Sequence, residues 1–222
     1  MGDTPTAAKL KSIYERLLAC YGPQHWWPGE TPFEVMVGAM LTQSAAWSNV
    51  EKAIGNLKAA GNMSAAALRE IQIADLAKLI FPSGYYNAKA KKLKALVEWL
   101  GKNGDDLSRL DNRDTDGLRW ELLAVHGVGP ETADSILLYA LGKPVFVIDA
   151  YTRRLFARLG VRPGKDNYDG WRALFMDNLP RDAKLFNEYH ALIVRHGKEK
   201  CHKSSQCFEC CLYADCGNRG ER

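Results

Sequence analysis

The sequence lacks long hydrophobic runs and has few stretches that favour a β-sheet. No apolar segment approaches the ~18 residues of a transmembrane helix, and the first dozen residues lack the apolar core of a secretory signal. Residues 145–148 form the only β-like run, and four residues do not make a sheet. We therefore expect a cytoplasmic protein that has no membrane partner and no sheet.

Strong charge of one sign is also missing. The chain has 222 residues, with 30 Lys and Arg against 26 Asp and Glu, so its formal net charge is only +4. This balance permits a polyanionic partner without requiring one. The length allows one large domain or two small ones, each able to bury a core.

Cysteine is scarce outside one short segment. Five of the six cysteines lie within residues 201–216, and Cys20 stands alone. A disulfide framework would spread cysteines over the chain and is typical of secreted proteins. The clustering indicates a metal site instead.

Apolar residues recur with the period of an α-helix along most of the chain. We expect an all-α fold of about ten short helices. Thr31 and Asp149 stand at helix N-cap positions. The expected helices cover residues 7–20, 32–41, 47–60, 64–70, 73–80, 85–101, 116–125, 131–141, 149–159, 166–178 and 182–197.

The segment 123–149 combines a glycine turn with a single carboxylate. The turn, His126 to Gly129, separates two helical patterns, and Asp149 follows 20 residues after Gly129. A Gly-x-Gly turn that opens a helix exposes backbone N–H groups, which bind an anion such as a phosphate. The alternative is an ordinary turn between helices followed by an N-capping Asp.

The cysteine spacing is Cys201-x5-Cys207-x2-Cys210-x5-Cys216, with Cys211 beside the third. Four thiolates from one loop can hold a tetrahedral zinc or a [4Fe–4S] cluster. Zinc sites usually pair two short arms around a longer gap, so these intervals favour the cluster over zinc or unligated thiols. Such a cluster can order the end of the chain without taking part in catalysis.

These motifs together resemble a known family. The chain resembles the helix–hairpin–helix (HhH-GPD) DNA glycosylase superfamily in four features that follow one another. These are the hairpin at Gly127 and Gly129, the helix after it, Lys143-Pro144 and Asp149. The four-cysteine loop resembles its endonuclease III branch. The resemblance runs from about Phe33 to Cys216. It implies a two-lobed all-α fold: a six-helix barrel with the hairpin at 25–138, and a second helical lobe from 1–24 and 139–222 that carries the [4Fe–4S] cluster loop, 201–216.

The resemblance implies a base excision repair enzyme that binds double-stranded DNA and flips a damaged base out of the helix. Asp149 would stabilise the positive charge that develops at C1′ of the sugar as the base leaves. We expect a nucleoid-associated monomer. The residues expected to contact DNA are Gln43, His126, Gly127, Val128, Gly129, Thr132 and Arg153.

Glu131 departs from the bifunctional members of the family. They carry a Lys two residues after the second hairpin glycine, and it forms a Schiff base with the sugar. A carboxylate cannot do this, and Lys143 lies too far along the helix. We therefore expect a monofunctional glycosylase without AP-lyase activity.

The cysteine loop departs as well. Its first interval is five residues where the family usually has six, and Cys211 stands where a Pro is usual. The choice between Cys210 and Cys211 as the third ligand stays open.

The base pocket is expected to contain the Trp26-Trp27-Pro28 loop, Trp47 and Glu131. Three motifs resemble the 3-methyladenine DNA glycosylase III type: the Trp-Trp-Pro loop, the Leu-Thr-Gln that ends at Gln43, and the hairpin with Glu131. The faces of tryptophan attract a cationic alkylated purine. That group usually lacks the cysteine loop, so the chain mixes features of two branches, and the tryptophans can also be core residues.

Two alternatives stay open. One is an endonuclease III-like glycosylase for oxidised pyrimidines, mismatched uracil or thymine, or mispaired adenine. The other is a non-catalytic protein that binds damaged DNA. Among further polar residues, we interpret His190 and His196 as helix-surface or cluster-neighbouring groups. Lys89, Lys91, Lys92 and Lys94 are interpreted as a solvated helix face, with a stripe that binds phosphates as the alternative.

Overall fold

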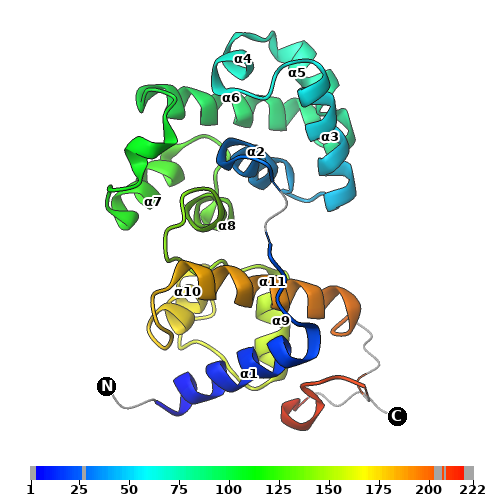
Figure 1. Ribbon diagram of the computed structural model, residues 1–222, viewed down its shortest axis with the longest axis vertical. Helices are drawn as coiled ribbons and strands as arrows, with labels where there is room; N and C mark the ends of the chain where they lie inside the picture. The colour runs from blue at the N-terminus through cyan, green and yellow to red at the C-terminus, as the bar shows by residue number, and fades with distance from the viewer. Residues whose placement is uncertain (1–3, 27–28, 203–206, 208, 218–222) are drawn as a thin grey trace. The chain divides into compact units, whose positions relative to one another are not determined.

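The computed structural model describes residues 4–26, 29–202, 207 and 209–217. This part of the chain is helical and contains no β-strand, which confirms the predicted fold class (Figure 1). None of the helices in these ranges is both long and apolar enough to cross a membrane. The α-helices are α1 (Pro5–Tyr21), α2 (Pro32–Leu41), α3 (Trp47–Ala59), α4 (Ala65–Glu70), α5 (Ile73–Leu79), α6 (Tyr86–Lys102), α7 (Thr115–Ala124), α8 (Pro130–Ser135), α9 (Ala150–Arg158), α10 (Tyr168–Met176) and α11 (Ala183–Glu199).

The chain divides into two compact units. One unit is continuous and covers residues 28–143, with helices α2 to α8. The other combines residues 1–27 with 144–222 and contains α1, α9, α10 and α11. We call them the continuous unit and the split unit. The short helical turns are η1 (Phe81–Ser83), η2 (Leu107–Leu110) and η3 (Ile136–Ala140) in the continuous unit, and η4 (Tyr213–Asp215) in the split unit.

The core of the continuous unit is built around α2. Thr31 caps this helix as predicted, because its hydroxyl accepts a hydrogen bond from the backbone N–H of Glu34 at 3.1 Å. Every residue of α2 from Glu34 to Leu41 is buried. The buried Glu34 carboxylate is paired with the ammonium of Lys58 at 2.9 Å, which offsets the cost of burying its charge.

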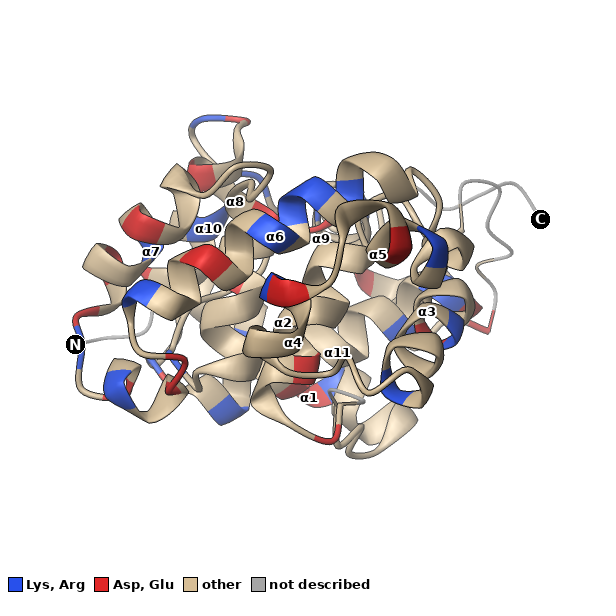
Figure 2. Cartoon of the chain, turned by 90° about the horizontal axis from the view of Figure 1, so that it is seen from above, with Lys and Arg blue, Asp and Glu red and all other residues tan. Residues whose placement is uncertain are grey.

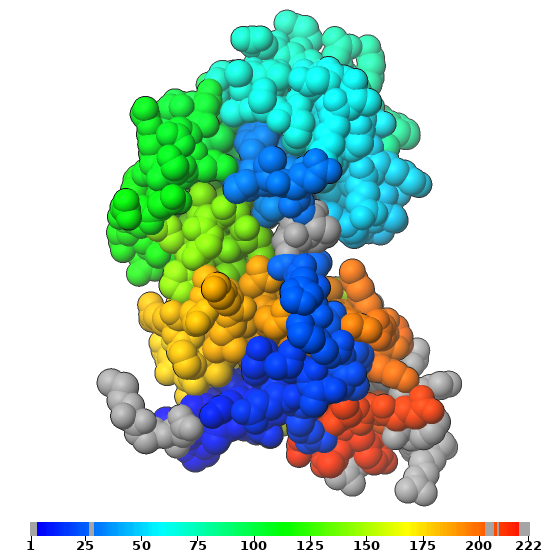
Figure 3. Space-filling view, viewed as in Figure 1, coloured from blue at the N-terminus to red at the C-terminus, as the bar shows by residue number. Residues whose placement is uncertain are grey.

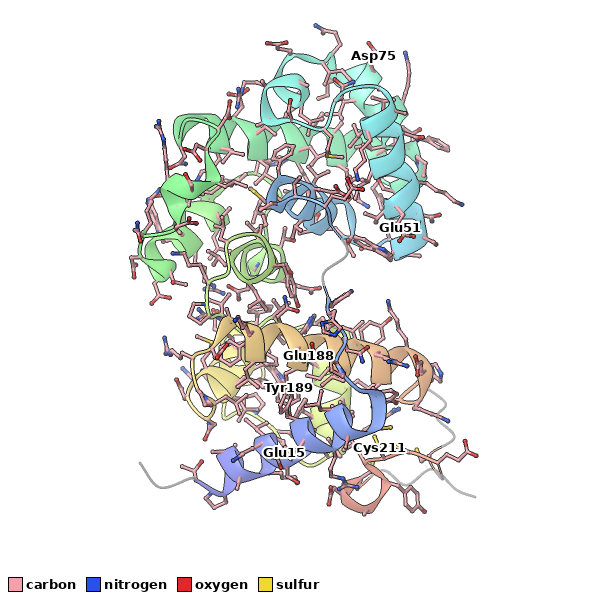
Figure 4. The ribbon with its side chains drawn as sticks, in the orientation of Figure 1. Glu15, Glu51, Asp75, Glu188, Tyr189 and Cys211 are labelled. Atoms are coloured by element: carbon pink, nitrogen blue, oxygen red, sulfur yellow. The ribbon has the colours of Figure 1, made fainter. Side chains whose placement is uncertain are left out.

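The split unit has an aromatic core. Phe146 lies in the buried segment 145–148 and stacks on Phe175 of α10, with ring centroids 4.0 Å apart. It also meets Phe186 and Tyr189 of α11 edge-on. Tyr189 donates from its hydroxyl to the carbonyl of Leu10 in α1 at 2.7 Å, which ties α1 to α11 (Figure 4). This core holds the chain immediately before Asp149.

The end of α1 also meets the C-terminal loop of the same unit. The Arg16 guanidinium pairs with Asp215 and donates to the carbonyl of Cys211. In the space-filling view the N-terminal residues (blue) and the residues around 210–217 (red) accordingly lie side by side (Figure 3). The cysteine loop is therefore packed against α1.

The helix after the hairpin differs from its predicted form. The pattern predicts one helix over 131–141, whereas the structure has α8 followed by the π-helical turn η3. The backbone N–H of Leu141 bonds to the carbonyl of Ile136, five residues back, at 3.2 Å. An apolar period cannot distinguish this wider turn from a regular α-helix.

The prediction that Lys89 belongs to a solvated face is wrong. Basic residues are numerous on α6 (Figure 2), but Lys89 is only 2% exposed. Its ammonium donates to the carbonyls of Leu41 and Ser83, at 2.7 and 2.6 Å. Burial, together with the charge of Lys92, lowers the pKa of Lys89 to about 8. Lys89 thus joins the end of α2 and the turn η1 to α6.

We expect Lys89→Met to destabilise the protein by about 1–3 kcal/mol at pH 7, because two buried carbonyls lose their donor. The gap to wild type should widen between pH 8 and about pH 10.4, the ordinary pKa of a lysine. In that window the unfolded Lys89 holds more protons than the folded one, so wild-type stability rises with pH. Denaturant unfolding at several pH values measures both effects.

Lys91→Met on the same helix is the matched control, because Lys91 is exposed. It should unfold like wild type at each pH. A constant gap between wild type and Lys89→Met from pH 7 to 10 would contradict the low pKa of Lys89.

Candidate functional site

The glycine turn joins α7 to α8 in the continuous unit. Gly127 has φ +82°, a conformation that glycine adopts without strain. Val128 is buried, and its N–H donates to the carbonyl of Val125 at 3.0 Å. His126 is exposed, and the space beside Gly129 is open. The backbone at the start of α8 is therefore accessible to an anion.

Gln43, from the loop after α2, is bonded to this turn. Its side-chain amide donates to the carbonyl of Gly127 at 3.0 Å and to the hydroxyl of Thr132 at 2.9 Å. The ammonium of Lys92 donates to the Gln43 carbonyl oxygen at 2.6 Å. Thr132 is buried, so its hydroxyl supports the turn from inside. The structure thus brings together Gln43, Gly127 and Thr132, three of the residues predicted to contact DNA.

Asp149 lies at the N-terminus of α9 in the split unit and caps that helix, as predicted. Its Oδ1 accepts a hydrogen bond from the backbone N–H of Thr152 at 2.7 Å. Burial acts to raise the pKa of the Asp149 carboxyl, but His190 and the hydrogen bonds from Thr152 outweigh it, so that the pKa is lowered. Asp149 is therefore a carboxylate that stays ionised at neutral pH although only 12% of its side chain is exposed.

His190 is the residue that sequence reasoning missed. It is 4% exposed rather than on the helix surface, and its Nε2 lies 3.5 Å from Oδ2 of Asp149. The ring of Trp26 stacks on His190, with centroids 5.7 Å apart and planes at 27°. The split unit thus brings together Asp149, His190 and Trp26. A histidine in an apolar helix pattern gave no sign of this, because its partners are distant in sequence.

The other predicted site residues are more dispersed. In the split unit, Arg153 is half-buried in the first turn of α9. In the continuous unit, Trp47 opens α3 and donates from its indole N–H to Glu51 at 2.7 Å, and Glu131 is exposed in the first turn of α8. Trp27 and Pro28, predicted for the base pocket, lie outside the described residues.

The cysteine loop encloses a cavity within the split unit. Cys201, Cys207, Cys210 and Cys216 line it, together with Arg158 and His196. These four are the cysteines that the spacing singles out. In the described ranges, no three His, Cys, Asp or Glu side chains already form a compact metal-binding group. The donor set, four thiols around one cavity, fits a [4Fe–4S] cluster.

Cys210 and Cys211 are in different environments. Hydrogen bonds from Cys211, from His196 and from the backbone N–H of Leu212 lower the pKa of Cys210 to about 4, although burial acts against them. The pKa of Cys211 is raised. The causes are its hydrogen bond with Cys210, its burial, and the hydrogen bond and charge of Cys20. Cys211 is absent from the cavity lining and lies beside α1 (Figure 4). Only Cys210 therefore combines thiolate character with a place in the cavity wall.

Basic and polar groups surround these sulfurs. Arg158 donates to the Sγ of Cys201 at 3.1 Å, and the Nε2 of His196 lies 3.6 Å from the Sγ of Cys210. His196 is fully buried and its Nδ1 is 2.8 Å from the hydroxyl of Tyr21. The interpretation of His196 as a neighbour of the cysteine loop agrees with this position.

Two exposed aromatic residues are a further feature that the sequence pattern did not single out as functional. Phe81 and Tyr85 are 62% and 76% exposed, and Tyr85 has φ +45° at the N-terminus of α6. Exposed rings stack readily on unpaired bases. The signal in the sequence was Gly84 followed by two tyrosines between helical patterns.

Comparison with known proteins identifies the relatives of this chain. The model of the HhH-GPD superfamily base excision DNA repair protein matches residues 37–181. A Methanocaldococcus jannaschii protein with the provisional name DNA repair glycosylase MJ1434 is 47% identical over 209 residues, 93% of this chain and 95% of that one. Endonuclease III of Escherichia coli is 27% identical over 183 residues, 82% of each chain.

Solved structures have the same fold. H. pylori 3-methyladenine DNA glycosylase (MagIII), bound to 1,N6-ethenoadenine, is 30% identical with a TM-score of 0.74 over 88% of this chain and 98% of that one. A non-covalent endonuclease III–DNA complex reaches a TM-score of 0.82 at 21% identity and covers 97% of both chains.

The turn at 126–129 provides a test with a matched control. Gly127→Ala should destabilise the protein by about 1–3 kcal/mol, because a Cβ at φ +82° is strained and would overlap the side chain of Lys92. Gly129→Ala should be nearly neutral for stability, since Gly129 has φ −92° and open space beside it. Denaturant unfolding compares the two, and equal stabilities would contradict this account of the turn.

Proposed function

Because the chain belongs to the HhH-GPD superfamily of base excision DNA repair proteins, as its motifs indicate, we propose that this DNA glycosylase removes an alkylated purine from double-stranded DNA. 3-Methyladenine is the representative substrate. The enzyme hydrolyses the N-glycosidic bond and leaves an abasic site without cutting the strand. The observation that carries the proposal is an ionised and mostly enclosed Asp149 in the same unit as an aromatic ring, Trp26.

Asp149 supports the chemistry of bond cleavage. As the bond between C1′ and the base breaks, the electron pair leaves with the base and positive charge develops on the sugar. A carboxylate removed from bulk water stabilises that charge more strongly than one in solvent. It can also orient the water that attacks C1′. The depressed pKa of Asp149 keeps it in the charged form that this role requires.

An alkylated purine suits this set of residues. A 3-methylated adenine is cationic before cleavage and leaves as a neutral base, so no general acid is needed. A tryptophan face attracts such a cation by ~0.5–2 kcal/mol. Trp26 is half-exposed and offers a ring for stacking. The similarity to the H. pylori 3-methyladenine DNA glycosylase, at 30% identity, supports the same substrate class.

The absence of strand cleavage rests on the amines of the continuous unit. Glu131 occupies the position where bifunctional relatives carry the Schiff-base lysine. The nearest alternative in sequence, Lys143, is buried, and its ammonium donates to the carbonyls of Asp111 and Arg113. An amine held in this way is not free to attack a sugar.

The hairpin and the cysteine loop complete the proposed enzyme. The backbone N–H groups at Gly127 and Gly129 would bind the phosphodiester of the DNA. Cys201, Cys207, Cys210 and Cys216 would hold a [4Fe–4S] cluster, and Arg158 and His196 would donate to its sulfur ligands. When bound, the cluster orders the C-terminal loop and supplies a one-electron redox centre.

An endonuclease III-like specificity is the second candidate. Its support is the E. coli relative, 27% identical over 82% of the chain, and the four-cysteine loop of this chain, which resembles that branch. Its substrates would be oxidised pyrimidines, mismatched uracil or thymine, or mispaired adenine. A non-catalytic protein that binds damaged DNA is a weaker candidate, since a binder gains nothing from a carboxylate near the anionic backbone.

Duplexes that each carry one damaged or mismatched base test the substrate. We expect release of 3-methyladenine, with strand breaks only after alkali. Asp149→Asn should lower the single-turnover rate at least ~100-fold because the charge is lost, while affinity for an abasic duplex stays within about twofold.

Borohydride distinguishes the candidates, because it traps only a Schiff base on DNA. No trapped complex is expected. Trapping together with nicking at oxidised pyrimidines would favour the second candidate, and tight binding without turnover on any duplex would favour the non-catalytic one. An unchanged rate in Asp149→Asn would exclude Asp149 from the reaction.

The two adjacent cysteines test the cluster assignment. Cys210→Ser should abolish the broad visible absorption and the iron content of the purified protein, because it removes one of the four cysteine ligands that line the cavity. Cys211→Ser, the matched control, should keep both. The reverse result would make Cys211 the ligand, and zinc in place of iron in the wild type would refute the cluster.

A further inference from the structure

We infer that His190 is a positioning residue that serves two groups at once: it holds the second carboxylate oxygen of Asp149 and supports the ring of Trp26. This inference rests on the proposed function, in which Asp149 acts at the sugar and Trp26 receives the base. It adds a residue to that site and assigns it a role in both rate and affinity.

Each carboxylate oxygen of Asp149 has a polar neighbour. Oδ1 accepts the backbone N–H of Thr152 at 2.7 Å, as an N-cap requires. Oδ2 faces Nε2 of His190 at 3.5 Å. Bonds of this kind are often long without substrate and shorten in the complex. With Oδ1 fixed by the helix, His190 decides how the carboxylate plane is turned.

The imidazole is itself fixed by its surroundings. His190 is 4% exposed on α11, and Phe146 of the aromatic core meets its ring edge-on, at 6.5 Å and 87°. The Trp26 ring lies nearly parallel to it at 5.7 Å. One face of Trp26 is therefore backed by His190. A base that stacks on the opposite face of Trp26 would therefore be separated by one ring from His190, which also contacts Asp149.

This arrangement links base binding to the orientation of the carboxylate. The contact with Asp149 depends on the imidazole N–H, whereas the contact with Trp26 depends on the flat ring. The two contributions can be separated by substitution, because one replacement keeps the ring and another keeps the donor. A merely structural histidine would give no such separation.

Single-turnover kinetics on a 3-methyladenine duplex make the separation. His190→Phe keeps a flat ring but has no donor, so the maximal rate should fall about 10- to 100-fold with half-saturation within about twofold. His190→Gln keeps an N–H donor but no ring, so half-saturation should rise about 3- to 10-fold with a smaller loss of rate.

Double variants check the partners. In an Asp149→Asn background, His190→Phe should lower the rate no further, because the carboxylate it orients is gone. In a Trp26→Ala background, His190→Gln should no longer raise the half-saturation concentration.

Tyr189→Phe is the structural control. It lies next to His190 on α11 and loses a buried hydrogen bond to Leu10, so it should lower the unfolding midpoint without separating rate from affinity. The inference is overturned if His190→Phe reacts like wild type, or if both His190 variants lower rate, affinity and unfolding midpoint together as a loosened helix would. Failure of the proposed function gives a different result, because the wild-type protein itself would then release no base.

Discussion

An ionised carboxylate that has lost most of its contact with water is the constraint on which the proposed chemistry depends. Burial favours the neutral acid, so partners inside the protein must supply what water no longer does. Asp149 receives a hydrogen bond from the first turn of α9, the favourable dipole of that helix and the nearby His190 of α11. Its lowered pKa means that these partners prevail. The packing of α9 and α11 on the aromatic core therefore governs the charge of the group.

The glycine turn of the continuous unit, to which we assign the binding of a phosphate, is supported in a different way. The Gln43 amide donates to the carbonyl of Gly127 and to the hydroxyl of Thr132, so it supports the turn without using a backbone N–H group. Backbone N–H groups at the start of a helix are those that bind an external anion. Lys92 places its ammonium on the far end of the Gln43 amide, which brings a positive charge beside the turn without using up the backbone donors. A phosphodiester would benefit from both.

The sequence predicted features that are local and failed where partners are distant. Helices and the caps at Thr31 and Asp149 follow from patterns within a few residues, so their positions agree with the structure. The π-helical turn η3 was missed, because it shares the apolar period of an α-helix. The interpretation of His190 and Lys89 as surface residues was wrong. Trp26 beside His190 and the Leu41 carbonyl beside Lys89 lie tens of residues away, and no single-sequence pattern encodes such contacts.

The cysteine loop and the Asp149 carboxylate both contact helices α9 and α11, at different residues. Asp149 caps the first turn of α9, and Arg158 in the last turn donates to Cys201. On α11, His190 contacts Asp149, and His196, nearly two turns later, contacts Cys210. A cluster bound by the loop would thus fix the C-terminal ends of α9 and α11, while Asp149 caps the N-terminus of α9 and His190 lies in the middle of α11. The cluster would therefore have a structural role in a reaction that transfers no electrons, because rigid helices keep Asp149 oriented.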